Sequence, residues 1–183
     1  MKRACGIVLA LLVLGGCATP PAPRYYTLDM SPSGNAGAPV NIDIQRLRES
    51  EALARKDILI KKSPTEIEYY AAEQWAATLG ELVRQKLDAE FGPGADKRQT
   101  LVLSGTILDF GQVDTPGGAQ AHVRLALEFR PADASLHAPP LFKKTYDVHL
   151  PAKSSTPQDV VVALSEGLER IAADVAADVS GLQ

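Results

Sequence analysis

The spacing of apolar residues alternates between a strand period and a helical period along the chain, and this order constrains the fold most. Val40, Ile42 and Ile44 alternate with polar residues, as in a half-buried strand. Further β-rich runs occupy residues 57–62, 66–70, 99–114, 119–131 and 141–150. Apolar residues recur instead at spacings of three and four in 71–92 and 161–179. Strand blocks separated by single helices predict one α+β domain, with a mainly antiparallel sheet and two principal helices packed on it.

Local signals delimit these elements. Turn-forming residues at 63–65 and 115–118 predict two hairpins. Gly105 and Gly111 predict bends or bulges inside the long strand at 99–114. Thr156 is suited to cap the N-terminus of the last helix, because its hydroxyl can accept a hydrogen bond from a backbone amide of the first turn.

The N-terminus has the residue order of a secretory signal peptide. Lys2 and Arg3 precede an unbroken apolar run at 7–14, and small residues follow. The run is shorter than the roughly 20 residues that a helix needs to cross a bilayer. We therefore expect residues 1–16 to be a signal peptide that is cleaved after Gly16.

Leu14-Gly15-Gly16-Cys17 is similar to a bacterial lipobox, in which signal peptidase II cuts before the cysteine. A cysteine is required because its thiolate is the nucleophile that takes up the lipid. The alternative is an ordinary signal peptide with a cysteine nearby by chance. We predict that Cys17 carries a diacylglycerol and an N-acyl chain such as palmitate, and that no other cofactor is bound.

Cleavage before Cys17 changes the charge and the location expected of the mature chain. Loss of Lys2 and Arg3 takes the formal net charge from −3 to −5, and loss of Cys5 leaves no pair of thiols. In the sorting rule for Gram-negative lipoproteins, an aspartate after the lipidated cysteine retains the protein at the inner membrane. Ala18 occupies this position, which implies the periplasmic face of the outer membrane.

The mature chain divides into a tether and a domain. Residues 17–39 are expected to form the lipidated cysteine and a flexible tether, with three prolines in 18–24 and a short YYTL strand at 25–28. The α+β domain is then expected to span 40–183.

Charge and motif content argue against nucleic-acid binding and catalysis. A net charge of −3 and a pI near 5.6 differ from the basic character of nucleic-acid binders. The sequence contains no Gly-x-Ser-x-Gly elbow and no phosphate-binding loop. His122, His137 and His149 lack the spacing of metal ligands, and no cysteine or carboxylate cluster joins them, so no metal site is expected. We predict a protein that is not an enzyme.

Three aromatic residues stand close together in a chain with only 5% aromatic content: Tyr69, Tyr70 and Trp75. One interpretation places Trp75 in the core, at the start of the apolar face of the helix predicted at 71–92. The other makes these residues a contact surface for a partner protein or a lipid.

The order of these features resembles the ABC-type transport auxiliary lipoprotein family, which includes the PqiC (YmbA) lipoproteins of MCE-type transport systems. The resemblance covers roughly residues 25–180. It rests on the lipobox, the tether, Tyr25-Tyr26-x-Leu28, and a tyrosine-rich strand that leads into a helix with Trp75, Leu79 and Leu87.

The resemblance implies a non-enzymatic envelope lipoprotein that works with an inner-membrane ABC ATPase–permease and an MCE-domain protein. Its cargo would be lipids or other hydrophobic molecules moving between the two membranes. The alternative is an envelope-assembly or cell-wall-associated lipoprotein that binds another envelope protein without a transport role. The cargo, the surface that meets the partner and the formation of a homo-oligomer are left open by the sequence.

Overall fold

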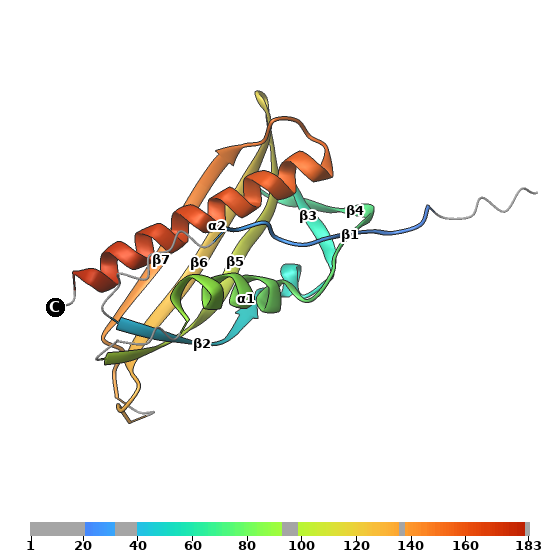
Figure 1. Ribbon diagram of the computed structural model, residues 1–183. Coiled ribbons are helices and arrows are strands. Elements are labelled where there is room, and N and C mark those ends of the chain that lie inside the picture. Colours follow the sequence, from blue (N-terminus) through green and yellow to red (C-terminus); the bar gives the residue numbers. More distant parts are fainter. Residues whose placement is uncertain (1–20, 32–39, 93–98, 136–137, 182–183) are drawn as a thin grey trace, which may run out of the picture.

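The computed structural model describes residues 21–31, 40–92, 99–135 and 138–181 (Figure 1). Its elements, in chain order, are β1 (Arg24–Tyr26), β2 (Val40–Glu49), the short 3₁₀ helix η1 (Glu51–Leu53), β3 (Asp57–Ser63), β4 (Glu66–Trp75), α1 (Leu79–Phe91), β5 (Gln99–Thr115), β6 (Gly118–Pro131), β7 (Phe142–Pro151) and α2 (Pro157–Ser180).

The strands form one seven-stranded sheet in the order β1-β4-β3-β5-β6-β7, with β2 also paired to β5. The hairpins β3–β4, β5–β6 and β6–β7 are antiparallel, whereas β1–β4, β2–β5 and β3–β5 are parallel. The long strand β5 lies at the centre, because β2 pairs with its first half and β3 with its second half. The predicted α+β fold with a mostly antiparallel sheet and two principal helices is confirmed.

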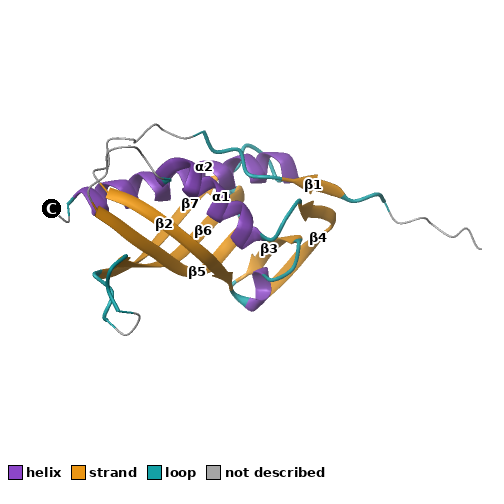
Figure 2. Cartoon of the chain, turned by 60° about the horizontal axis from the view of Figure 1, so that its bottom comes forward, coloured by secondary structure: helices purple, strands orange, loops and turns teal. Residues whose placement is uncertain are grey.

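Both helices lie on the same face of the sheet (Figures 1 and 2). Helix α2 packs on β6, β7 and β5, and α1 packs on β2. Residues of β6 alternate accordingly: Val123, Leu125, Leu127 and Phe129 are buried in the core beneath the helices. The even-numbered residues of β6 point to the opposite side, which we call the open face.

Helix α2 begins at a satisfied cap. The Thr156 hydroxyl accepts a hydrogen bond from the Asp159 amide (3.3 Å), and Pro157 occupies the first turn, where no backbone donor is needed. Gly167 lets the helix approach β6 closely, because a Cβ there would lie 2.9 Å from Cγ2 of Val123. The apolar stripe of α2 is buried along its whole length, from Val160 to Val179.

The first helix is shorter than the sequence predicted. It begins at Leu79, and residues 66–75 form the single strand β4. Pairing explains the difference: β4 is hydrogen-bonded to β3 on one side, and on the other Tyr26 pairs in register with Trp75. Trp75 therefore belongs to a strand, and the helical spacing of apolar residues within 71–78 is overridden by these ladders.

Part of the predicted tether belongs to the folded domain. Residues 24–26 form β1, and Leu28 and Met30 are buried against the core. The Asp29 amide donates a hydrogen bond to Oγ of Ser165 on α2 (3.0 Å). The folded unit therefore includes residues that lie before the predicted boundary at 40. The predicted signal peptide at 1–16, Gly16 and Cys17 lie outside the described residues.

Candidate functional site

A bulge in β5 creates a charged cluster on the open face. The register between β5 and β6 shifts between Ile107 and Asp109 and stays regular at Gly105 and Gly111. The backbone of Leu108 leaves the ladder here, and its carbonyl accepts a hydrogen bond from the Ser50 hydroxyl (3.2 Å). Because one extra residue reverses the alternation of sides, Asp109 joins the open face while Phe110 enters the core.

The two glycines have another role. Gly105, predicted as a bend or bulge, instead faces a register shift in the neighbouring strand β2, between Ile44 and Leu47. A Cβ on Gly105 would lie 2.3 Å from the carbonyl oxygen of Ala126, and one on Gly111 would lie 2.6 Å from that of Leu59. Both positions therefore permit a close approach of neighbouring strands.

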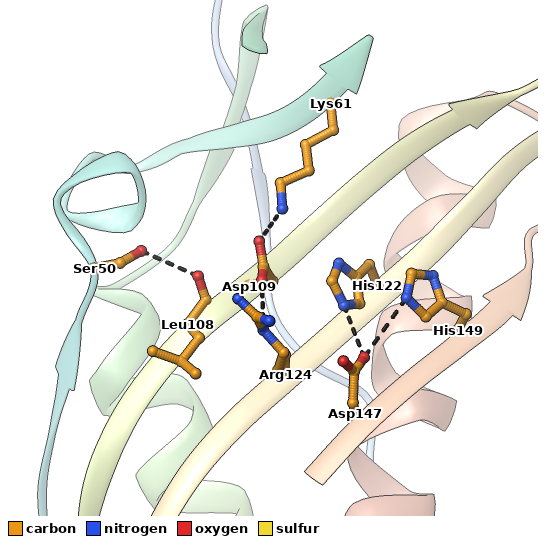
Figure 3. Close-up of polar contacts among 8 residues, drawn as sticks. All are labelled: Ser50, Lys61, Leu108, Asp109, His122, Arg124, Asp147 and His149. Atoms are coloured by element: carbon orange, nitrogen blue, oxygen red, sulfur yellow. Dashed lines mark hydrogen bonds and ion pairs between the residues drawn. The ribbon is translucent and has the colours of Figure 1, made fainter. Parts of the chain in front are cut away.

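Asp109 is a buried carboxylate held between two cations (Figure 3). Its Oδ1 forms an ion pair with the Lys61 ammonium of β3, and its Oδ2 lies 2.8 Å from Nε of Arg124 on β6. The three residues come from three adjacent strands, so the interaction ties β3, β5 and β6 together on this face. A buried charge needs such partners, since an isolated carboxylate would lose its hydration without compensation.

Two histidines and an aspartate lie beside this cluster. His122 and His149 are direct partners across the β6–β7 ladder, and their rings stack with centroids 3.9 Å apart and an angle of 15°. Nε2 of His122 lies 2.9 Å from Oδ1 of Asp147, and Nε2 of His149 lies 3.6 Å from the same oxygen (Figure 3). Burial lowers the pKa of His122, although the hydrogen bond with Asp147 opposes this effect.

The expectation that no carboxylate joins these histidines was wrong, because Asp147 lies close to both His122 and His149. Their 27-residue spacing matches no motif, and the register of β6 on β7 brings them together. The available signal was local: Asp147 and His149 are two residues apart on one predicted strand, and therefore share a face. His137 lies outside the described residues. Lys61, Asp109 and Arg124 were not singled out from the sequence.

A polar depression lies further along the open face. It has a volume of about 290 Å³, and its lining comprises residues of β2, β5, β6 and β7, among them Arg48, Ser104, Thr106, Glu128, Lys143 and Thr145. The Lys143 ammonium pairs with the Glu128 carboxylate across β6 and β7 (2.6 Å). The open face thus carries paired charges and hydroxyl groups, the chemistry of polar recognition.

The aromatic residues predicted as a contact surface are tied into the domain. Trp75 is 2% exposed and packs edge-on against Phe110 in the core, which agrees with the core interpretation. The Tyr69 hydroxyl donates to the carbonyl of Ala52 (2.9 Å). The Tyr70 hydroxyl bonds to Gln112, and burial raises the pKa of Tyr70 to about 12. Both tyrosines are half-buried, and a contact with a partner through their exposed parts stays a prediction.

Solved structures show the same fold. Protein XCC0632 from Xanthomonas campestris, described as a DUF330 protein, is 12% identical, with a TM-score of 0.75 over 87% of this chain and 96% of the other. A second structure, described only as an uncharacterized protein, is 16% identical, with a TM-score of 0.68 over 87% of this chain and 99% of the other. The class defined by the fold is thus a single α+β domain with two helices on one face of a mixed sheet.

The chain belongs to the ABC-type transport auxiliary lipoprotein family, because its sequence matches the model for that family's lipoprotein component over residues 26–176. Members are auxiliary components of ABC-type transport, which agrees with the resemblance stated from the sequence. No curated protein matches the chain. Within the described part of the chain, no helix combines the length and apolar character needed to span a bilayer.

Proposed function

We propose that this protein is a lipoprotein of the outer membrane that serves as a non-enzymatic auxiliary component of an MCE-type ABC transport system. In this role Cys17 carries the acyl chains, and the domain docks with an MCE protein that conducts lipids or other hydrophobic molecules between the membranes. Family membership over residues 26–176 supports the transport role. The lipobox and Ala18 support the anchor and its location.

The observation that carries this proposal is the family match over residues 26–176, and the position of Cys17 in the sequence supports a domain held close to the membrane. Strand β1 begins at Arg24, so only six residues separate Cys17 from the sheet. Six residues span at most about 20 Å when fully extended. The β1 edge of the sheet is therefore kept near the lipid surface, and the domain has little freedom to reach far into the periplasm.

Side-chain contacts hold β1 at this edge of the sheet. The Arg24 guanidinium donates three hydrogen bonds to the buried Glu73 carboxylate, from Nε and Nη2, at 2.5 to 3.0 Å. Tyr25 next to it is 62% exposed. An exposed tyrosine close to the anchor suits the membrane interface, where the ring contacts acyl chains and the hydroxyl remains hydrated.

Lipidation is tested by replacing the cysteine. Cys17→Ala should abolish the incorporation of labelled fatty acid and leave the precursor uncleaved. Cys5→Ala is the matched control, since this cysteine lies within the signal peptide and should be processed normally. Normal processing of the Cys17 variant would contradict the anchor. In a Gram-negative host, Ala18→Asp should move the protein to the inner-membrane fraction; an unchanged outer-membrane location would contradict the assigned sorting.

The transport role is tested by purification from membranes under conditions that preserve envelope complexes. The wild-type protein should retain an MCE-domain protein, and the Cys17→Ala variant should retain much less of it. Retention of a different envelope protein with no MCE protein would favour the assembly or cell-wall role instead. Because the variant domain remains folded, its circular dichroism spectrum distinguishes a lost anchor from a lost fold.

A further inference from the structure

We propose that His122, Asp147 and His149 form a binding site on the open face for a divalent cation of the zinc class. The two histidines face each other across adjacent strands, and Asp147 precedes His149 by two residues on the same side of β7. Their ligand atoms all lie within 4.8 Å of one another. Two imidazoles and one carboxylate are the ligands of many zinc sites that keep a fourth position for water.

The separations between ligand atoms agree with this assignment. At bond lengths of about 2.1 Å, two ligands of a tetrahedral zinc ion are about 3.4 Å apart. Oδ1 of Asp147 lies 2.9 Å from Nε2 of His122 and 3.6 Å from Nε2 of His149, so the observed separations bracket that value. Figure 3 shows the Asp147 carboxylate joined to Nε2 of both histidines, so the three ligand atoms lie in one small cluster.

One ligand is fixed and the other two can adjust. The His122 side chain is 10% exposed and lies on β6, between β5 and β7. The side chains of Asp147 and His149 are about half exposed, on the edge strand β7. The imidazoles are stacked in this structure, so His149 must turn to direct its lone pair at the same ion as His122. The exposure of the His149 side chain allows that rotation. The same exposure leaves the fourth coordination position of the metal ion open to water.

The surrounding charges permit a cation here. Arg124 is the register partner of Asp147, and Lys61 lies on the same face, but both cations pair with Asp109. Asp109 therefore neutralises part of the positive charge next to the site, and the carboxylate of Asp147 is left to the histidines. Nitrogen ligands select zinc, copper or nickel over magnesium and calcium, which prefer all-oxygen sites.

The consequence of binding would be a cross-link between β6 and the edge strand β7. Because the ligands come from both strands, bound metal would stabilise the folded state and raise the melting temperature. This inference is independent of the proposed transport role, since it rests only on residues of the open face.

Calorimetric titration of the full chain with Zn²⁺ tests the site. The chain should carry no affinity tag, and the thiols of Cys5 and Cys17 should be alkylated so that they cannot bind zinc. We expect one equivalent of Zn²⁺ to bind and to raise the melting temperature, and Mg²⁺ to do neither. The proposal would be overturned if one equivalent of Zn²⁺ failed to bind at micromolar protein concentration and the melting temperature stayed unchanged.

Variants locate the bound ion. His149→Ala should weaken Zn²⁺ binding at least on the order of 10- to 100-fold, and Asp147→Asn should weaken it less. His137→Ala removes the remaining histidine and should leave the affinity unchanged. An unchanged affinity in His149→Ala would refute the site.

A spectroscopic measurement does not depend on the stability of any variant. With Cu²⁺ in place of Zn²⁺, the wild-type electron paramagnetic resonance spectrum should show hyperfine coupling to two imidazole nitrogens. Coupling to no nitrogen, or to only one imidazole nitrogen, would exclude the assigned ligands.

Discussion

At the scale of single residues, the bulge at Leu108 determines which side chains meet on the open face. Without the extra residue, Asp109 would point into the core, where no cation would compensate its charge. With it, the carboxylate lies between Lys61 and Arg124. The bulge thus moves the Asp109 carboxylate from a position where its burial would be unfavourable to one where it forms ion pairs across three strands.

Replacing Asp109 should reveal the contribution of this network. Asp109→Asn keeps the shape of the side chain but removes its charge, and it leaves two cations close together. We expect the free energy of unfolding to fall by about 1–3 kcal/mol, as measured by urea denaturation. Glu68→Gln, an exposed carboxylate on β4, is the control and should change stability little. Equal effects of the two substitutions would contradict the assigned role.

Asp178 on α2 gives a prediction about acid stability. Burial alone would raise its pKa, but hydrogen bonds from Lys144 (2.6 Å) and Tyr146 (2.7 Å) on β7 hold it below the ordinary value of 3.8. A carboxyl group with a lowered pKa in the folded state stabilises the protein above its unfolded pKa. That stabilisation is lost as the pH falls through the folded pKa.

Asp178→Asn should therefore remove a stabilisation that is present near neutral pH. The stability difference between wild type and this variant should shrink as the pH is lowered from about 6 to about 2. Asp174→Asn, at an exposed aspartate one turn earlier, is the control for a general effect of charge removal. A difference that stays constant over this range would show that the titration of Asp178 is not coupled to folding.

At the scale of elements, α2 is positioned by its first turn and by its contact with β6. The helix covers β5, β6 and β7, so its start determines the register of the whole apolar stripe against the sheet. Thr156 and Asp159 define that start, and Ser154 reinforces it through a hydrogen bond to the Asp159 carboxylate (2.6 Å).

Removal of the cap should lower stability without changing the fold. Thr156→Ala leaves the Asp159 amide without its partner and should cost about 1 kcal/mol in thermal or urea denaturation. Thr156→Asn should retain most of the wild-type stability, because the asparagine side chain also accepts a hydrogen bond from a backbone amide of the first turn. If alanine and asparagine destabilised the protein equally, the cap would not be the cause.

At the scale of the whole molecule, the N-terminal segment completes the domain. Residues 24–30 follow the predicted anchor closely, cross the edge of β4 and then pack against α2. Leu28 is 1% exposed there.

Truncating Leu28 should consequently destabilise the whole domain. Leu28→Ala removes buried methyl groups and leaves a cavity, so the free energy of unfolding should fall by about 2–5 kcal/mol. Tyr25→Ala, three residues earlier at an exposed position, should have little effect in the same denaturation experiment. If Leu28→Ala lowered the free energy of unfolding by less than Tyr25→Ala does, residues 24–30 would not unfold cooperatively with the rest of the domain.

Hydrophobic periodicity and turn residues predicted the fold class, most strands and the last helix, because these depend on local spacing. The pattern failed at 71–78, where ladders on both sides of β4 extend the strand to Trp75. It predicted a short strand at 25–28 but placed it in a tether, since the contact of Asp29 with Ser165 joins residues more than 130 positions apart.

The sequence by itself determined the local features: the residue order on which the predicted lipobox at Cys17 rests, the alternation of strands and the cap at Thr156. Only the tertiary structure decided which side chains share the open face. His122 meets His149, and Asp109 meets Arg124, through the register between strands and one bulge. Register results from the summed packing of whole faces, and a shift of one residue exchanges every neighbour, so no local pattern encodes these pairs.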